Sequence, residues 1–186
     1  MSRTIEASTY IKVAPSQAFA VLSDYASYRD WMPDVLESRL LASEGDVAVA
    51  EFFVPEVGPS KFVLEFIESS PDWLKYQQVD RYRHAGLSGR WDLEEADGGA
   101  GVVVRASQSL STGVFRIGRR KRMQHGLEKT LEALQERALR LAAHVASGGY
   151  LEKRKILELS KTGDRLRIDF EGKTYDFVQR TGGEAP

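Results

Sequence analysis

The sequence contains no cysteine, and this absence excludes disulfides, thiolate nucleophiles and thiolate metal sites. No apolar run reaches the roughly 18 to 20 residues that a membrane-spanning helix needs. The N-terminal segment MSRTIEAS has no hydrophobic stretch, so we expect no secretory signal. Together these absences predict a cytoplasmic protein.

Catalytic and metal-binding motifs are also scarce. The three histidines, His84, His125 and His144, lie far apart, and no local spacing pairs them with a serine or a carboxylate as a triad requires. An HExxH motif, a Gly-rich phosphate loop and clustered metal ligands are missing. We therefore expect no metal site, no cofactor and no catalytic residue.

The residues that are present predict an ordinary globular domain, with 42% hydrophobic and 28% charged residues. Apolar and polar residues alternate from Ile5 to Val13, which indicates a half-buried strand. Pro15 suits the first turn of a helix over Gln17 to Leu22. Tyr25, Tyr28 and Trp31 then recur at three-residue spacing, as on one side of a second short helix.

The middle of the chain alternates between apolar runs and turn residues, which is typical of consecutive antiparallel hairpins. The predicted strands are Leu36–Ser43, Val47–Val54, Lys61–Glu68, Leu74–Tyr82, Leu87–Glu95 and Val102–Leu110.

A long amphipathic helix follows. Its apolar stripe recurs every three or four residues over about six turns, from Met123 to Val145, and Ser147-Gly148-Gly149 ends it. Gly126 lies inside this helix at a cost of roughly 1 kcal/mol relative to alanine. Either a backbone or a ligand approaches closely there, or the glycine is simply tolerated.

The last segment, residues 150–186, has a different pattern. Short alternating stretches separated by Lys161-Thr162-Gly163-Asp164 and Glu171-Gly172-Lys173 predict three short strands. So few residues seldom fold alone, so we expect two parts: a ligand-binding domain over residues 1–149, and a small β appendage over 150–186 that packs on this domain or on another subunit. Gly182 to Pro186 is expected to be disordered.

The order of these elements resembles the START-like or helix-grip (SRPBCC) superfamily, in its polyketide cyclase/dehydrase and coenzyme Q-binding branch. The residues that carry the resemblance over about residues 3–146 are Pro15, Phe19, the run Leu22-Ser23-Asp24-Tyr25, the run Trp31-Met32-Pro33, the run Gly89-Arg90-Trp91-Asp92-Leu93, the run Val102-Val103-Val104 and the closing helix. The resemblance implies an α+β helix-grip fold, in which a curved antiparallel sheet wraps around the long C-terminal helix.

The resemblance also implies a deep hydrophobic pocket between sheet and helix. By phase and by resemblance, the candidate wall residues are Trp31, Phe53, Phe66, Tyr76, Trp91, Gln108, Met123 and Leu127. The aromatic residues of this set either fill the core or line a cavity for an isoprenoid, fatty-acyl or polycyclic ligand. Gln108 falls on the expected buried face, so its amide needs a hydrogen-bond partner, which is either a neighbour or a ligand carbonyl.

Charge is concentrated in one place. Five basic residues and no acidic one lie between positions 116 and 122: Arg116, Arg119, Arg120, Lys121 and Arg122. In the first turns of a helix that begins near Val114 to Gly118, these cations oppose the helix dipole. The cluster is either a solvated face or a surface for an anionic partner, such as a phospholipid bilayer, a phosphorylated ligand or RNA.

We therefore expect a non-catalytic binding or transfer protein for a hydrophobic small molecule, of which a polyprenyl quinone or a lipid is the favoured ligand. The first alternative is a cyclase or dehydratase acting on a poly-β-ketone, with Tyr76, Tyr82, Arg90 or Gln108 polarising a carbonyl. The second is a module that binds ribosomal RNA through the basic cluster. The sequence does not predict the oligomeric state.

Overall fold

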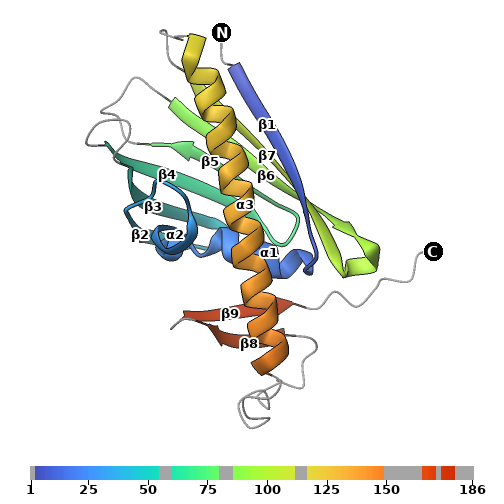
Figure 1. The fold of residues 1–186 in the computed structure, drawn as a ribbon. Coiled ribbons are helices and arrows are strands. Elements are labelled where there is room, and N and C mark those ends of the chain that lie inside the picture. Colours follow the sequence, from blue (N-terminus) through green and yellow to red (C-terminus); the bar gives the residue numbers. More distant parts are fainter. Residues whose placement is uncertain are drawn as a thin grey trace, which may run out of the picture.

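The computed structural model describes residues 3–54, 60–79, 86–111, 117–148, 165–170 and 173–178. Seven strands form one curved antiparallel sheet in the order β1-β7-β6-β5-β4-β3-β2, with β1 and β2 at its two open edges (Figure 1). The strands are β1 (Arg3–Ile11), β2 (Glu37–Glu44), β3 (Val47–Val54), β4 (Ser60–Ser69), β5 (Trp73–Gln78), β6 (Gly86–Ala96) and β7 (Gly101–Ser111). The predicted α+β architecture and its strand order along the chain are confirmed.

Two short helices link β1 to β2. α1 (Pro15–Ser23) has its proline in the first turn, and the Gln17 side chain accepts a hydrogen bond from the backbone N–H of Ala14 at 3.1 Å. A 3-10 turn, η1 (Tyr25–Ser27), and α2 (Tyr28–Trp31) continue the chain. A second 3-10 turn, η2 (Asp97–Gly99), joins β6 to β7.

The long helix α3 (Ile117–Gly148) crosses one face of the sheet, which we call the inner face (Figure 1). Its buried stripe consists of Leu127, Leu131, Leu134, Ala138 and Leu141, each at most 5% exposed. The helix lies closest to β1 and α1. At the β1 side, the Gln124 amide donates to the Glu6 carbonyl at 3.0 Å, and the Thr9 hydroxyl donates to Gln135 at 3.4 Å.

Alternation along the strands places the remaining core side chains. Ile5 and Ile11 of β1, Ala50 of β3, Leu74 of β5 and Val104 of β7 point to the inner face and are at most 3% exposed. Burying such apolar side chains contributes roughly 1.5 to 3 kcal/mol each. The other face of the sheet, which we call the outer face, is turned away from α3.

Beyond α3, a separate hairpin forms from β8 (Arg165–Phe170) and β9 (Lys173–Val178). It lies at the C-terminal end of α3, where β9 adjoins α1 and β8 adjoins α3 (Figure 1). The third strand predicted in this segment, around Leu157 and Leu159, lies outside the described residues, as do Asp80–Tyr82 at the predicted end of the fifth strand of the meander.

Candidate functional site between the sheet and the long helix

A chain of aromatic rings crosses the inner face. Tyr25 stacks on Phe66 at 4.0 Å between ring centroids, and Phe66 lies 6.0 Å from both Phe52 and Tyr76. Tyr28 lies 5.3 Å from Phe52. Aromatic pairs contribute about 0.5 to 1.5 kcal/mol beyond the area that they bury. The rings therefore fix the segment after α1 onto strands β3 and β4.

Trp31 extends this chain of rings. It packs edge-on against Tyr28 at 5.1 Å, and its helix α2 lies next to α3. Within the part of the chain that the structure describes, its indole N–H is shielded from solvent and has no hydrogen-bond partner. Buried polar groups in proteins are nearly always paired. The Trp31 N–H is thus a donor available to an acceptor on a bound molecule.

A polar pair lies farther along the inner face. The Gln108 side chain on β7 hydrogen-bonds the hydroxyl of Tyr76 on β5. Burial raises the pKa of the Tyr76 hydroxyl, and the hydrogen bond from Gln108 only partly opposes this rise. Tyr76 therefore stays protonated at neutral pH. Because the amide donates to it, the Tyr76 O–H remains available to donate to a carbonyl.

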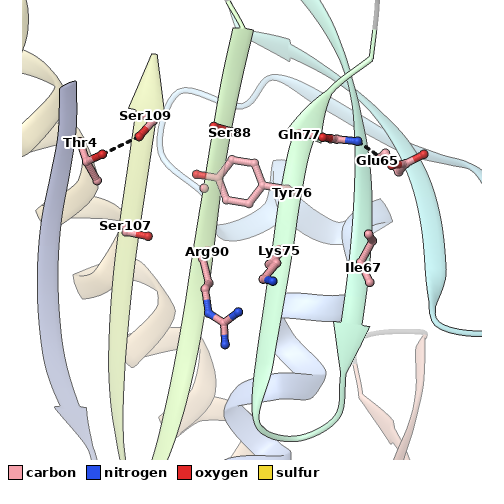
Figure 2. A pocket seen from close by; sticks show the side chains of 11 residues that line it. Thr4, Glu65, Ile67, Lys75, Tyr76, Gln77, Ser88, Arg90, Ser107 and Ser109 are labelled. Atoms are coloured by element: carbon pink, nitrogen blue, oxygen red, sulfur yellow. Dashed lines mark hydrogen bonds between the residues drawn. The ribbon is translucent and has the colours of Figure 1, made fainter. Parts of the chain in front are cut away.

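The position of Tyr76 depends on a glycine in the neighbouring strand. Tyr76 faces Gly89 across the β5–β6 ladder, and its ring reaches from β5 towards β6 (Figure 2). A Cβ atom at position 89 would overlap the Tyr76 hydroxyl and the backbone oxygen of Ser107. The glycine is required at this close approach, which brings Tyr76 within reach of Gln108.

The carboxylate of Glu68 lies on the same face, near the end of β4. The Tyr25 hydroxyl donates to Glu68 at 2.5 Å, which ties η1 to the end of β4. Burial raises the pKa of Glu68; the hydrogen bond from Tyr25 opposes this rise, and the charge of Asp46 adds to it. The pKa of Tyr25 is raised by burial, by Tyr28 and by Glu68.

The N-terminal half of α3 contributes side chains to the same core. Leu127 is 5% exposed, and Met123 is half-buried and packs against the core. Apart from the chain neighbours of Gly126 and the backbone of its own helix, no atom of the described residues lies within 4 Å of the position that a Cβ atom would take at Gly126. The close backbone approach considered for Gly126 is therefore absent from the described part of the chain.

Seven of the eight predicted wall residues lie on the inner side of the sheet or against the core there: Trp31, Phe66, Tyr76, Trp91, Gln108, Met123 and Leu127. Phe53 does not. It alternates with the buried Phe52, pairs with Glu37 and Lys61, and therefore lies on the outer face. Two adjacent phenylalanines leave the phase of a strand ambiguous, which explains the error.

The remaining candidates for a catalytic role do not lie on the inner face of the described structure. Arg90 points to the outer face and pairs with Asp92 at 2.6 Å, so it does not serve a site on the inner face. Tyr82 and His84 lie outside the described residues. Within the described ranges, no group of three His, Cys, Asp or Glu side chains is arranged to hold a metal ion.

The basic cluster lies at the start of α3, which begins at Ile117, within the predicted range. Arg120, Lys121 and Arg122 are exposed. Arg116 lies outside the described residues, and the structure describes only the backbone of Arg119.

The Tyr25–Glu68 contact was not among the site contacts predicted from the sequence. The sequence did contain one relevant signal: Tyr25, Tyr28 and Trp31 recur at three-residue spacing, which predicted that the three rings lie on one side of a short helix. Glu68, the partner of Tyr25, lies 43 residues farther along the chain, so no local pattern links the two.

The amino-acid sequence of this chain matches a known family. Residues 2–146 match the model of the family described as polyketide cyclase/dehydrase and lipid transport. A search of curated proteins found no significant match. No helix among the described residues is long and apolar enough to span a membrane.

Solved structures share the fold. A START superfamily protein from Mycobacterium smegmatis aligns with a TM-score of 0.64 and 16% identity, over 74% of this chain and 98% of that one. A STAR-related lipid transfer protein from Xanthomonas axonopodis aligns at 0.64 and 23% identity, over 73% and 85% of the two chains. An aromatase/cyclase from a Streptomyces species aligns at 0.61 and 16% identity, over 80% and 99%.

Proposed function

Because this chain belongs to the polyketide cyclase/dehydrase and lipid transport family, whose members bind hydrophobic small molecules, we propose that it binds and carries such a molecule between the inner face of the sheet and α3. The buried, unpaired indole N–H of Trp31 carries this proposal, because within the described residues it is a donor without an acceptor. A ligand with a carbonyl group and an apolar body supplies both the acceptor and the surface that aromatic rings contact.

Within this class, a polyprenyl quinone matches the described groups better than a saturated lipid. A ring carbonyl would accept a hydrogen bond from the Trp31 N–H or from the Tyr76 O–H, while Phe66 and Leu127 contact the hydrocarbon. The proposed wall consists of Trp31, Phe66, Tyr76, Trp91, Gln108, Met123 and Leu127.

Native mass spectrometry of protein purified without detergent, followed by organic extraction, tests the proposal directly. A stoichiometric quinone or lipid is the expected result. Protein that is empty and also fails to bind a panel of quinones and lipids contradicts it. The variant Trp31→Phe keeps an aromatic ring but removes the N–H, so quinone affinity should fall by about five- to ten-fold. Affinity for an alkyl chain without a carbonyl should remain unchanged.

A second candidate is a cyclase or dehydratase of a poly-β-ketone. The observation that favours it is the buried Tyr76 hydroxyl, which the Gln108 amide orients and which remains a proton donor because its pKa is raised. Such a group polarises a carbonyl but does not act as a base. Incubation with a polyketide synthase product decides this: cyclisation lost in Tyr76→Phe supports the enzyme, and an unchanged product distribution contradicts it.

We further propose that the basic cluster docks the protein on an anionic bilayer, where each basic residue contributes about 1 kcal/mol. Exposure of Arg120, Lys121 and Arg122 supports this. Charge reversal of Arg119, Arg120 and Arg122 should abolish co-sedimentation with vesicles containing phosphatidylserine. A matched triple reversal of the exposed Lys12, Lys61 and Lys129 should not. Salt-insensitive binding, or salt-sensitive binding to ribosomal subunits alone, contradicts the membrane proposal.

A further inference from the structure

A hollow of about 370 Å³ lies on the outer face of the sheet, on the side opposite the proposed hydrophobic site (Figure 2). It spans strands β1, β7, β6, β5 and β4, so its walls are formed by hydrogen-bonded ladders. The lining residues are Thr4, Glu65, Ile67, Lys75, Tyr76, Gln77, Ser88, Gly89, Arg90, Ser107 and Ser109. Its volume falls at the lower end of the range for small-molecule sites, about 300 to 1,000 Å³.

The hollow exists because short side chains lie beside long ones. Thr4 and Ser109 lie opposite each other on β1 and β7, and their hydroxyl oxygens are 2.7 Å apart. Ser88 and Ser107 add two more small hydroxyl side chains on β6 and β7. The longer side chains on β4 and β5 form the opposite wall (Figure 2). The surface between them is rich in hydroxyl groups.

Two cations lie side by side at one end. Lys75 and Arg90 are direct partners in the β5–β6 register, and like charges in this position destabilise a sheet. Both cations lie over the ring of Trp73. The Lys75 ammonium is 4.9 Å and the Arg90 guanidinium carbon is 4.8 Å from the ring centroid. Cation–π contacts of this kind fix the two groups in place.

The charges of this pair are only partly compensated. Arg90 bonds Asp92 at 2.6 Å. Within the described residues, the Lys75 ammonium contacts no carboxylate, and its one partner is the Trp73 ring. An anion bound between Lys75 and Arg90 would relieve the like-charge repulsion that the fold otherwise has to sustain.

The other end carries hydrogen-bonding groups of a different kind. The Gln77 amide donates to Glu65 at 2.8 Å, which orients both side chains along the wall. Carboxylate and amide groups, together with serine hydroxyls, have the donors and acceptors that bind the hydroxyl groups of a polyol. Ile67 is the aliphatic side chain in the lining. The hydroxyl, amide and carboxylate groups of the lining therefore suit a ligand that carries hydroxyl groups.

We propose that this hollow is a second binding site and that it takes a phosphorylated polyol of the sugar-phosphate type. The phosphate lies between Lys75 and Arg90, and the hydroxyl groups contact Ser88, Ser107 and Gln77. The sheet lies between this site and the proposed hydrophobic site on the inner face, and Tyr76 is the one residue named in both linings.

Amide NMR spectra recorded during titration with glucose 6-phosphate test the proposal, with glucose and inorganic phosphate as comparison ligands. We expect saturable shifts confined to residues of the hollow on β5, β6 and β7. Glucose 6-phosphate should bind at least about ten-fold more tightly than either comparison ligand. Only this ligand has both a phosphate for the cationic end of the hollow and hydroxyl groups for its hydrogen-bonding end. Absence of saturable shifts overturns the site, and equal affinity for inorganic phosphate overturns the polyol assignment.

Two lysine variants on the same face sharpen the test. Lys75→Gln should weaken glucose 6-phosphate binding about ten-fold, because a charge-assisted contact is lost. Lys61→Gln is the matched control, since Lys61 is exposed on the outer face but is absent from the lining of the hollow. An equal loss in both variants overturns the proposal.

The same polyol chemistry occurs in soluble metabolites and in lipid headgroups. Co-sedimentation with vesicles containing phosphatidylinositol phosphate separates these sources. Loss of that binding in Lys75→Gln assigns the ligand to a headgroup. Vesicle binding that is unaffected by Lys75→Gln, together with saturable glucose 6-phosphate binding, assigns it to a soluble compound.

Discussion

The hydroxyl of Tyr76 occupies the space that a side chain at position 89 would fill, so Gly89 determines where Tyr76 lies. The two residues are partners in the β5–β6 register, and the Tyr76 hydroxyl is also hydrogen-bonded by Gln108. The glycine, the tyrosine and the glutamine come from three adjacent strands and act as one unit on the inner face.

Gly89→Ala should displace the Tyr76 ring, because the added methyl group overlaps its hydroxyl. We expect a loss of about 1 to 3 kcal/mol in the free energy of unfolding, as for overpacked cores, measured by urea denaturation. Affinity for a carbonyl ligand should fall as well. Ser88→Ala, on the neighbouring residue of the other face, is the control. An unchanged stability in Gly89→Ala would show that Tyr76 moves away without cost.

Gly126→Ala should have the opposite effect on stability. The space around the added methyl group is open, so the helix propensity of alanine should raise the free energy of unfolding by about 0.5 to 1 kcal/mol. If the hydrophobic ligand lies against Gly126, ligand affinity should fall in the same variant. A destabilised but folded variant would mean that the chain approaches Gly126 more closely than in the structure.

The stability of the protein should depend on pH through Glu68. Its pKa in the folded state is raised above the ordinary value of 4.5, so the native state binds this proton more tightly than the unfolded state does. The stabilisation from this proton is complete below the unfolded pKa and is lost as the pH rises through the folded pKa. Relative to Glu68→Gln, the wild-type protein should therefore lose stability as the pH rises above the ordinary carboxyl pKa of 4.5 and through the raised pKa of the folded state.

Urea denaturation of wild-type and variant proteins across this pH range measures the difference. Glu44→Gln, which removes an exposed carboxylate of the edge strand β2, is the matched control. A wild-type protein that gains stability relative to Glu68→Gln as the pH rises would contradict the assignment.

The pair formed by Tyr76 and Gln108 should show energetic coupling. Tyr76→Phe or Gln108→Leu alone leaves the partner without its hydrogen bond, at a cost of about 1 to 3 kcal/mol. Replacing both should cost less than the sum of the two single changes. A double-mutant cycle by urea denaturation measures this difference, and strictly additive effects would show that the hydrogen bond does not form in solution.

Periodicity predicted most of the fold. Alternation of apolar and polar residues located the strands because one face of the sheet is buried against α3, and a three- and four-residue spacing located α3 itself. The assignment failed where the alternation stops: Phe52 and Phe53 are both apolar, and the strand register decides which one faces the helix.

The sites depend on relationships that no local pattern contains. Tyr25 and Glu68 come from distant segments, and Lys75 and Arg90 become neighbours through the β5–β6 register. In the sequence, Ser88 and Ser107 are simply polar residues of exposed strand faces. The hollow appears only when their small volumes lie beside the long side chains of another strand.

The position of α3 has a consequence for how such proteins diversify. Its backbone lies closest to β1 and α1, near one edge of the sheet. Side chains, among them Phe66, Tyr76 and Leu127, line the space between the helix and the central strands. The shape of the interior is thus determined mainly by side-chain volumes and rotamers. One or two substitutions can change the shape of this interior so that it accepts another molecule, while every strand pairing stays intact. Ligand specificity can therefore evolve faster than the fold.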